Sequence, residues 1–126
     1  MKIYTSYFGM AKKFNPLQFE LISITRYPPK QFKGFNYVKL APTAEILEAY
    51  KSSEPTETSK QEYIEKFKRD VLSKINAADV VKDLNRFACG KDVVLLCYEK
   101  NEDFCHRHIV AEWLTQNGYE TTIYQF

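Results

Sequence analysis

The chain has 126 residues, which suits one compact domain, and 44% of them are hydrophobic, enough for a single core. No apolar run approaches the roughly 20 residues that cross a bilayer, so we expect no membrane partner, and the net charge of +2 is too small by itself to indicate nucleic acid. Three cysteines are unlike a secreted disulfide scaffold, and residues 1–7 lack the apolar core of a signal peptide, so we predict a cytoplasmic protein with reduced thiols.

Aromatic and β-branched residues predict two strands near the start of the chain, over residues 3–8 and 19–25. Pro28-Pro29 then block further ladder pairing, so residues 30–42 are predicted to be irregular.

Charge is unevenly distributed along the chain. Residues 1–40 contain seven Lys or Arg and one acid, which favours an acidic or phosphorylated partner if these residues share one surface.

Two helices are predicted in the middle of the chain, separated by a loop. Thr43 is a suitable N-cap for the first, which runs to about residue 49. Residues 52–59 are rich in Ser, Thr, Pro and Glu and are predicted to form an exposed loop. The second helix spans about residues 60–75 and is amphipathic. Its apolar stripe consists of Tyr63, Ile64, Phe67, Val71 and Leu72.

The last third of the chain alternates helix and strand. Asn76 is a suitable cap for a helix that ends at Gly90, where a left-handed conformation is expected. The strongest strand follows over residues 92–99 and is apolar on both faces, as in a central parallel strand. A helix over residues 104–117 and a strand over residues 119–126 complete the chain.

Strands that alternate with helices predict the α/β class and one domain over residues 1–126. We expect a mostly parallel central sheet of about four strands with helices on both faces, a Rossmann-like three-layer arrangement. The only four glycines are scattered, so the chain lacks the usual glycine-rich dinucleotide fingerprint.

Ligands of open parallel sheets bind outside the carboxyl ends of the strands. The predicted strands place Ser6, Tyr7, Thr25 and Arg26 at these ends, and we predict that these residues contact a ligand. Glu99 lies at the tip of the central strand, on the same face as Cys97, because side chains alternate along a strand.

The helix after this strand carries Cys105, His106 and Arg107. Helical periodicity aims His106 at the sheet edge, close to Glu99. With Asp103 as N-cap, Cys105 falls in the first helical turn, where the partial positive charge lowers the pKa of a thiol. This pattern predicts Cys105 as a thiolate nucleophile or redox centre. Glu99 and His106 would handle protons, and Arg107 would bind an anion such as phosphate.

Alternatives stay open at each of these residues. Cys97 can be a small buried hydrophobe, His106 and Glu99 can form a structural clamp, and Arg107 can pair with Glu102 or Asp103. A metal centre is a further alternative, since zinc accepts sulfur, imidazole and carboxylate ligands, although the cysteine spacing matches no standard zinc module. Its ligands would be Cys97, Glu99, Cys105 and His106.

Residues 26–39 interleave cations with aromatic rings, and no acid intervenes. Such a segment suits single-stranded nucleic acid or a nucleotide base. The alternative is that the rings pin an irregular loop onto the core. The residues concerned are Arg26, Tyr27, Lys30, Phe32, Lys33, Phe35, Tyr37 and Lys39.

The stretches 95–99 and 104–108 resemble the domain of unknown function 488 (DUF488) family, in which an apolar strand ends in Cys-x-Glu and Cys-His-Arg opens a helix. The resemblance extends more loosely over nearly the whole chain, and residues 33–34 and 39–42 look like a shorter bacterial and phage branch. It implies an α/β fold and no established reaction. It also implies a motif of Cys97, Glu99, Cys105, His106 and Arg107.

One departure concerns the second strand. Many family members carry Asp-Val-Arg there, where this chain has Ser23-Ile24-Thr25, and Arg26 follows one position later. If that acid and arginine serve chemistry, Arg26 substitutes for the arginine imperfectly.

These observations favour a small-molecule site, for a nucleotide- or phosphate-like ligand, at the carboxyl edge of the sheet, with enzymatic chemistry through Cys105. A nucleic-acid or protein interaction module that uses residues 26–39 ranks second, and a metal-binding protein ranks third. The sequence identifies neither a substrate nor an oligomeric state.

Overall fold

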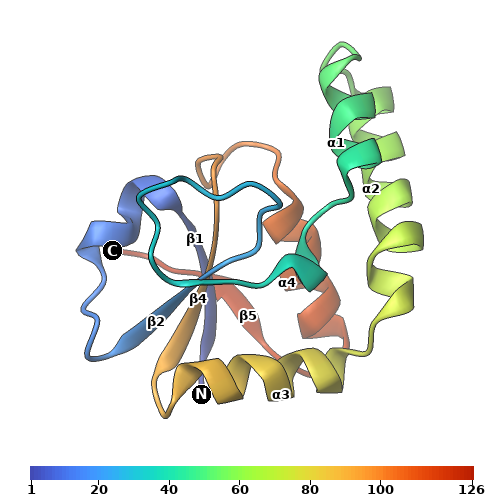
Figure 1. Ribbon diagram of the computed structural model, residues 1–126. Coiled ribbons are helices and arrows are strands. Elements are labelled where there is room, and N and C mark those ends of the chain that lie inside the picture. Colours follow the sequence, from blue (N-terminus) through green and yellow to red (C-terminus); the bar gives the residue numbers. More distant parts are fainter.

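The computed structural model describes residues 1–126 and has a parallel sheet of five strands at its centre (Figure 1). The predicted α/β class and parallel sheet are confirmed. The sheet has one strand more than expected, because two residues of the segment predicted to be irregular pair with β2. In sheet order the strands are β3 (Phe35–Asn36), β2 (Phe19–Ser23), β4 (Asp92–Cys97), β1 (Ile3–Tyr7) and β5 (Thr121–Ile123).

The central strand β4 lies between β1 and β2, with Cys97 beside Tyr7 and Leu96 beside Ser23. Residues 93–97 are fully buried, which explains why this strand is apolar on both faces. Because the three strands are parallel, their carboxyl ends meet at one edge of the sheet, as predicted.

All four α-helices contribute to one core cluster on one face of the sheet. Helices α3 and α4 pack directly on the strands, whereas α2 packs on α4, and α1 pairs with α2 in a hairpin that extends beyond the sheet (Figure 1). None of the helices is both long and apolar enough to cross a membrane. The helices are α1 (Ala44–Lys51), α2 (Glu57–Asp70), α3 (Ala77–Ala88) and α4 (His106–Gln116), with short 3-10 turns η2 (Val38–Leu40) and η3 (Leu72–Lys74).

The opposite face of the sheet is aromatic. A 3-10 helix, η1 (Phe8–Lys13), and irregular segments cover it. The third layer of the fold is therefore a 3-10 helix with loops, while the α-helices share the other side. The buried members of this cluster are Phe14, Phe19, Val94 and Leu96, and Tyr4, Phe8, Phe32 and Tyr124 pack against them.

Capping explains where the helices begin. Thr43 and Asn76 accept hydrogen bonds from the backbone N–H groups of Ile46 and Asp79, at 3.1 and 3.2 Å, as predicted for N-caps. Helix α2 starts at Glu57, inside the predicted loop, because Thr56 and Ser59 form a reciprocal capping box.

Several other element ends differ from expectation: β2 ends at Ser23 and α2 at Asp70, before the predicted residues 25 and 75, and α4 begins at His106, after the predicted residue 104. Helix α3 ends at Ala88, and Gly90 has the predicted left-handed conformation, with a φ of 89°, although Cys89 before it is left-handed as well, with a φ of 48°. Strand β4 ends at Cys97 instead of residue 99, because β1 ends beside it at Tyr7. Strand β5 has only three residues, and the ring of Tyr124 after it packs against the aromatic cluster.

Candidate functional site

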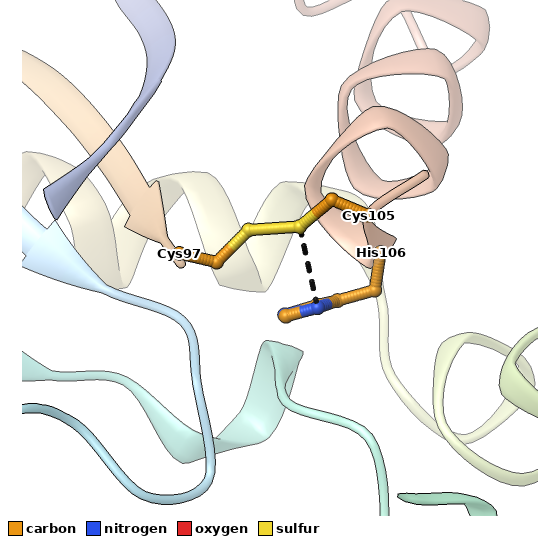
Figure 2. A group of neighbouring side chains, drawn as sticks. All are labelled: Cys97, Cys105 and His106. Atoms are coloured by element: carbon orange, nitrogen blue, oxygen red, sulfur yellow. Dashed lines mark hydrogen bonds between the residues drawn. A yellow bond between two sulfur atoms is a disulfide. The ribbon is translucent and has the colours of Figure 1, made fainter. Parts of the chain in front are cut away.

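Two of the three cysteines meet at the carboxyl edge of the sheet. Cys97 is the last residue of β4, and Cys105 is the N-cap residue of α4. Their sulfurs form a disulfide with an S–S distance of 2.13 Å (Figure 2). The predicted free thiol at Cys105 is therefore wrong, because the turn after β4 folds back and brings the two sulfurs together. Asp103 is not the N-cap, and exposed Cys89 is the only free cysteine.

His106 is buried at the start of α4, and its ring points toward the sheet edge, as helical periodicity predicted. Its Nε2 atom lies 2.6 Å from the backbone oxygen of Ile24. A carbonyl oxygen only accepts, so Nε2 carries the hydrogen, and in the neutral ring Nδ1 keeps a lone pair. Nδ1 lies 3.9 Å from the Cys105 sulfur (Figure 2).

Burial also fixes the charge of this ring. Desolvation lowers the pKa of His106 to about 4, and the positive charge of Arg107 lowers it further, against the hydrogen bond to Ile24. At neutral pH the imidazole is therefore uncharged.

Arg107 lies inside the protein and is fully buried. Its Nη1 donates to the Cys97 sulfur at 3.0 Å, and its Nη2 donates to Asn101 Oδ1 at 3.1 Å. The guanidinium also lies 5.9 Å from the centre of the Tyr7 ring, while its Nε has no partner. Burial lowers the pKa of Arg107, and the charge of Glu99 opposes this shift. The alternative pairing of Arg107 with Glu102 or Asp103 is wrong, since Arg107 forms no ion pair.

A cavity of about 540 Å³ opens beside the cysteine pair. It lies between the ends of β2 and β4, the start of α4 and the α1–α2 hairpin. Arg26 lines it, half-buried, and its Nε donates to the backbone oxygen of Pro42 at 2.8 Å. The terminal nitrogens of Arg26 have no acceptor in the protein. The predicted residues that share this cavity are Thr25, Arg26, Cys97, Glu99, Cys105 and His106.

Glu99 lines the cavity but does not partner His106. It lies in the exposed turn after β4, and His106 instead binds the Ile24 oxygen. Its charge acts on two neighbouring phenols. The pKa values of Tyr63 and Tyr98 are raised first by burial and second by Glu99. The predicted clamp between Glu99 and His106 is therefore not formed.

The three other residues predicted to contact a ligand lie at the strand ends, and each has different neighbours. Thr25 accepts or donates a hydrogen bond with Ser23, with their hydroxyl oxygens 3.0 Å apart. Tyr7 lies beside Arg107, outside the cavity. The hydroxyl of Ser6 is buried without a hydrogen-bond partner and is also outside the cavity.

Sequence reasoning missed the wall of the cavity that the α1–α2 hairpin supplies. Tyr63 was placed in the core by its helical stripe, and no motif marked the residues of α1. Only the way the hairpin folds back against Phe104 brings these side chains to the site, and no local pattern encodes that contact. The hairpin residues of this wall are Leu47, Tyr50, Lys51 and Tyr63.

A family model described as the active DUF488-N3 subclade, DUF488-N3a, matches residues 12–118. The chain belongs to the DUF488 family. No curated protein and no solved structure matches it. The match includes Cys97, Glu99, Cys105, His106 and Arg107, so the whole motif predicted from the resemblance lies within the family region, whereas β1 lies outside it.

The DUF488 motif also offers atoms that suit a metal. One ligand atom each from Cys97, Cys105 and His106 lies within 4.8 Å of the others, and all three residues are buried. Sulfur and imidazole are ligands that zinc accepts, provided that the sulfurs are reduced. Glu99, the fourth predicted ligand, is not in this group because the exposed turn carries it away.

The basic-aromatic segment of this DUF488 protein is largely tied to the core. The Phe35 ring stacks on Phe87 with centroids 4.5 Å apart, and the Phe32 ring packs edge-on against Phe8. Tyr37 is buried and donates a 2.5 Å hydrogen bond to Asp83. Tyr27 is the ring of the four that is mostly exposed. Three of the four rings thus pack against the core, which agrees with the alternative that the rings hold this loop onto the core.

Proposed function

We propose that this DUF488 protein binds a small anionic molecule, nucleotide- or phosphate-like, at the carboxyl edge of its sheet, and that Cys105 reacts with it. The observation that carries the proposal is the shared cavity of about 540 Å³, which Cys105, His106 and Arg26 all line. Cavities of this size accommodate metabolite-sized ligands. The description of the matched subclade as active agrees with chemistry at this site.

Each residue supports one part of this function. Arg26 is held by Pro42 through Nε alone, which leaves its terminal nitrogens free to form a two-point contact with an anion. When the disulfide is reduced, the lone pair of His106 Nδ1 faces the Cys105 thiol and can accept its proton. Glu99 at the rim would exchange protons with bulk water.

The competing functions have weaker support. Nucleic-acid binding through residues 26–39 would need stacking rings, and three of the four rings already pack within the protein.

We also propose a cytoplasmic location, which rests on the sequence pattern alone.

The anion site is tested by thermal unfolding with inorganic phosphate and with nucleoside monophosphates. We expect these to raise the melting temperature, and Arg26→Gln to weaken apparent affinity by about tenfold or more, since a bidentate charge-assisted contact is lost. Arg86→Gln, on the exposed surface of α3, is the matched control and should behave like the unchanged protein. Equal affinities of Arg26→Gln and Arg86→Gln would refute the proposal.

A further inference from the structure

The two sulfurs of the disulfide have different polar neighbours. The Cys97 sulfur accepts a hydrogen bond from Arg107 Nη1 at 3.0 Å, while the Cys105 sulfur faces His106 Nδ1 at 3.9 Å. The Cys97 sulfur therefore lies beside a cation, and the Cys105 sulfur lies beside an uncharged ring.

Arg107 is a buried cation without an anion. It is fully buried, it forms no ion pair, and its Nε has no hydrogen-bond partner. An unpaired charge inside a protein is costly. A thiolate on Cys97 would supply the missing negative charge at hydrogen-bond distance, so Cys97 is the sulfur that is better able to leave a disulfide as an anion.

We infer that this protein undergoes thiol–disulfide exchange with small thiols that carry an anionic group, with Cys105 as the attacked sulfur and Cys97 as the leaving sulfur. The inference rests on the proposed function, because the anion site at Arg26 selects the thiol.

The exchange balances as follows. A small thiol loses its proton to solvent, and its thiolate attacks the Cys105 sulfur. The bond between the two cysteines breaks, and its electron pair stays on Cys97 beside Arg107. A second small thiolate attacks the bound small-thiol sulfur, which releases a small disulfide and leaves an electron pair on Cys105, where a proton binds. Two small thiols are oxidised, the protein disulfide is reduced to one thiolate and one thiol, and one proton remains in solution.

The cavity supports the choice of substrate. Cys97 and Cys105 are both among its lining residues, and its volume of about 540 Å³ fits a thiol of metabolite size. Arg26 and Lys51 line it opposite a single acid, Glu99, so its lining favours an anion. The exposed Cys89 has no such surroundings, which makes it a natural control.

The first test identifies the attacked sulfur. Reduced Cys97→Ser protein is mixed with the disulfide form of mercaptopropionate, quenched with acid and weighed by mass spectrometry with peptide mapping. We expect one mercaptopropionyl group trapped on Cys105, because Cys97, the sulfur that would release it, is absent, and peptide mapping separates this group from any on exposed Cys89. Cys105→Ser should react at least about tenfold more slowly, and Cys89→Ser should behave like the unchanged protein.

The second test addresses the anionic group. The rate of reduction of the protein disulfide is compared for mercaptopropionate and neutral mercaptoethanol at equal thiolate concentrations. We expect mercaptopropionate to react about tenfold faster, and Arg26→Gln to remove this preference while retaining the mercaptoethanol rate.

The possible outcomes distinguish a failure of the exchange activity from a failure of the anion site. No trapping at Cys105, with phosphate stabilisation retained, overturns the exchange activity and leaves the anion site standing. Trapping with equal rates for the two thiols overturns the substrate class, and loss of phosphate stabilisation at the same time refutes the anion site as well. Reduced protein that holds about one zinc ion per chain and does not exchange makes the sulfurs metal ligands and overturns the inference.

Discussion

The two faces of the sheet differ in kind although the same strands supply both. The face covered by α-helices is mainly aliphatic, and at its carboxyl edge it holds the disulfide, His106 and Arg107. The opposite face is packed with rings that meet edge to edge, such as Phe19 against Phe14 at 5.2 Å. Burial lowers the pKa of both His106 and Arg107, so the first face contains ionisable groups whose charged forms are costly to bury.

This difference suggests that stability and chemistry are separable in this fold. Groups that are costly to bury collect where strands end and a helix starts, and the aromatic face has few such groups. Functional sites commonly depart from the pattern that stabilises the rest of a protein. Variants on the two faces should therefore change different measurements.

The largest effect is expected on the aromatic face. Phe19 is almost fully buried and contacts the rings of Tyr4, Phe14 and Tyr124. Phe19→Ala should lower the free energy of unfolding by about 3–5 kcal/mol, measured by urea denaturation, because it leaves a cavity. Phosphate should still raise the melting temperature by a similar amount. Leu17→Ala, at an exposed neighbour, should cost less than about 0.5 kcal/mol. A large loss of phosphate affinity in Phe19→Ala would show that the faces are coupled.

A smaller effect is expected from acid on the other face. The pKa of His106 is about 4 in the folded protein and roughly 6.5 when unfolded. Below about pH 6.5 the unfolded chain therefore binds a proton that the folded chain does not, and stability falls as pH falls. The loss should reach about 2 kcal/mol between about pH 7.5 and about pH 5, measured by urea denaturation.

Two variants identify the group responsible for this pH dependence. His106→Gln keeps a donor for the Ile24 oxygen but cannot titrate, so most of the slope should disappear. His108, whose pKa is also lowered by burial, is less buried, and His108→Gln should keep the larger part of the slope. If the two variants lose equal slopes, His106 is not the principal acid-sensitive group. Leu17→Ala should retain the full slope.

The sequence predicted the positions of the site residues better than their chemical states. Period-two and helical patterns placed Cys97, His106 and the strand ends at one edge, because alternation and helical rise are local properties of the backbone. Capping residues Thr43 and Asn76 were predicted for the same reason. The pairing of Cys97 with Cys105 depends on the path of the turn between them, which no local pattern specifies.

The burial of Arg107 is a second feature that local sequence patterns do not predict. Sequence position placed this residue beside the apolar stripe of α4, where a surface role was reasonable. The structure buries it under the ends of β1 and β4, where Cys97 at the end of β4 and Asn101 in the turn after it supply the acceptors. Tertiary context decided both the burial of this cation and the wall of the cavity that α1 forms.

The smallest effect is expected from two helix caps with similar hydrogen-bond distances, one on a helix that lines the cavity and one on a helix that does not. Thr43 caps α1, whose residues Leu47 and Lys51 line the cavity, while Asn76 caps α3, which contributes none of the lining. Thr43→Ala and Asn76→Ala should each lower the free energy of unfolding by about 1 kcal/mol. Fraying of α1 should also weaken phosphate binding several-fold, measured by calorimetric titration, whereas Asn76→Ala should leave it unchanged. Equal affinities in the two variants would mean that the hairpin is not part of the binding site, and that the strand ends and α4 suffice to hold the anion.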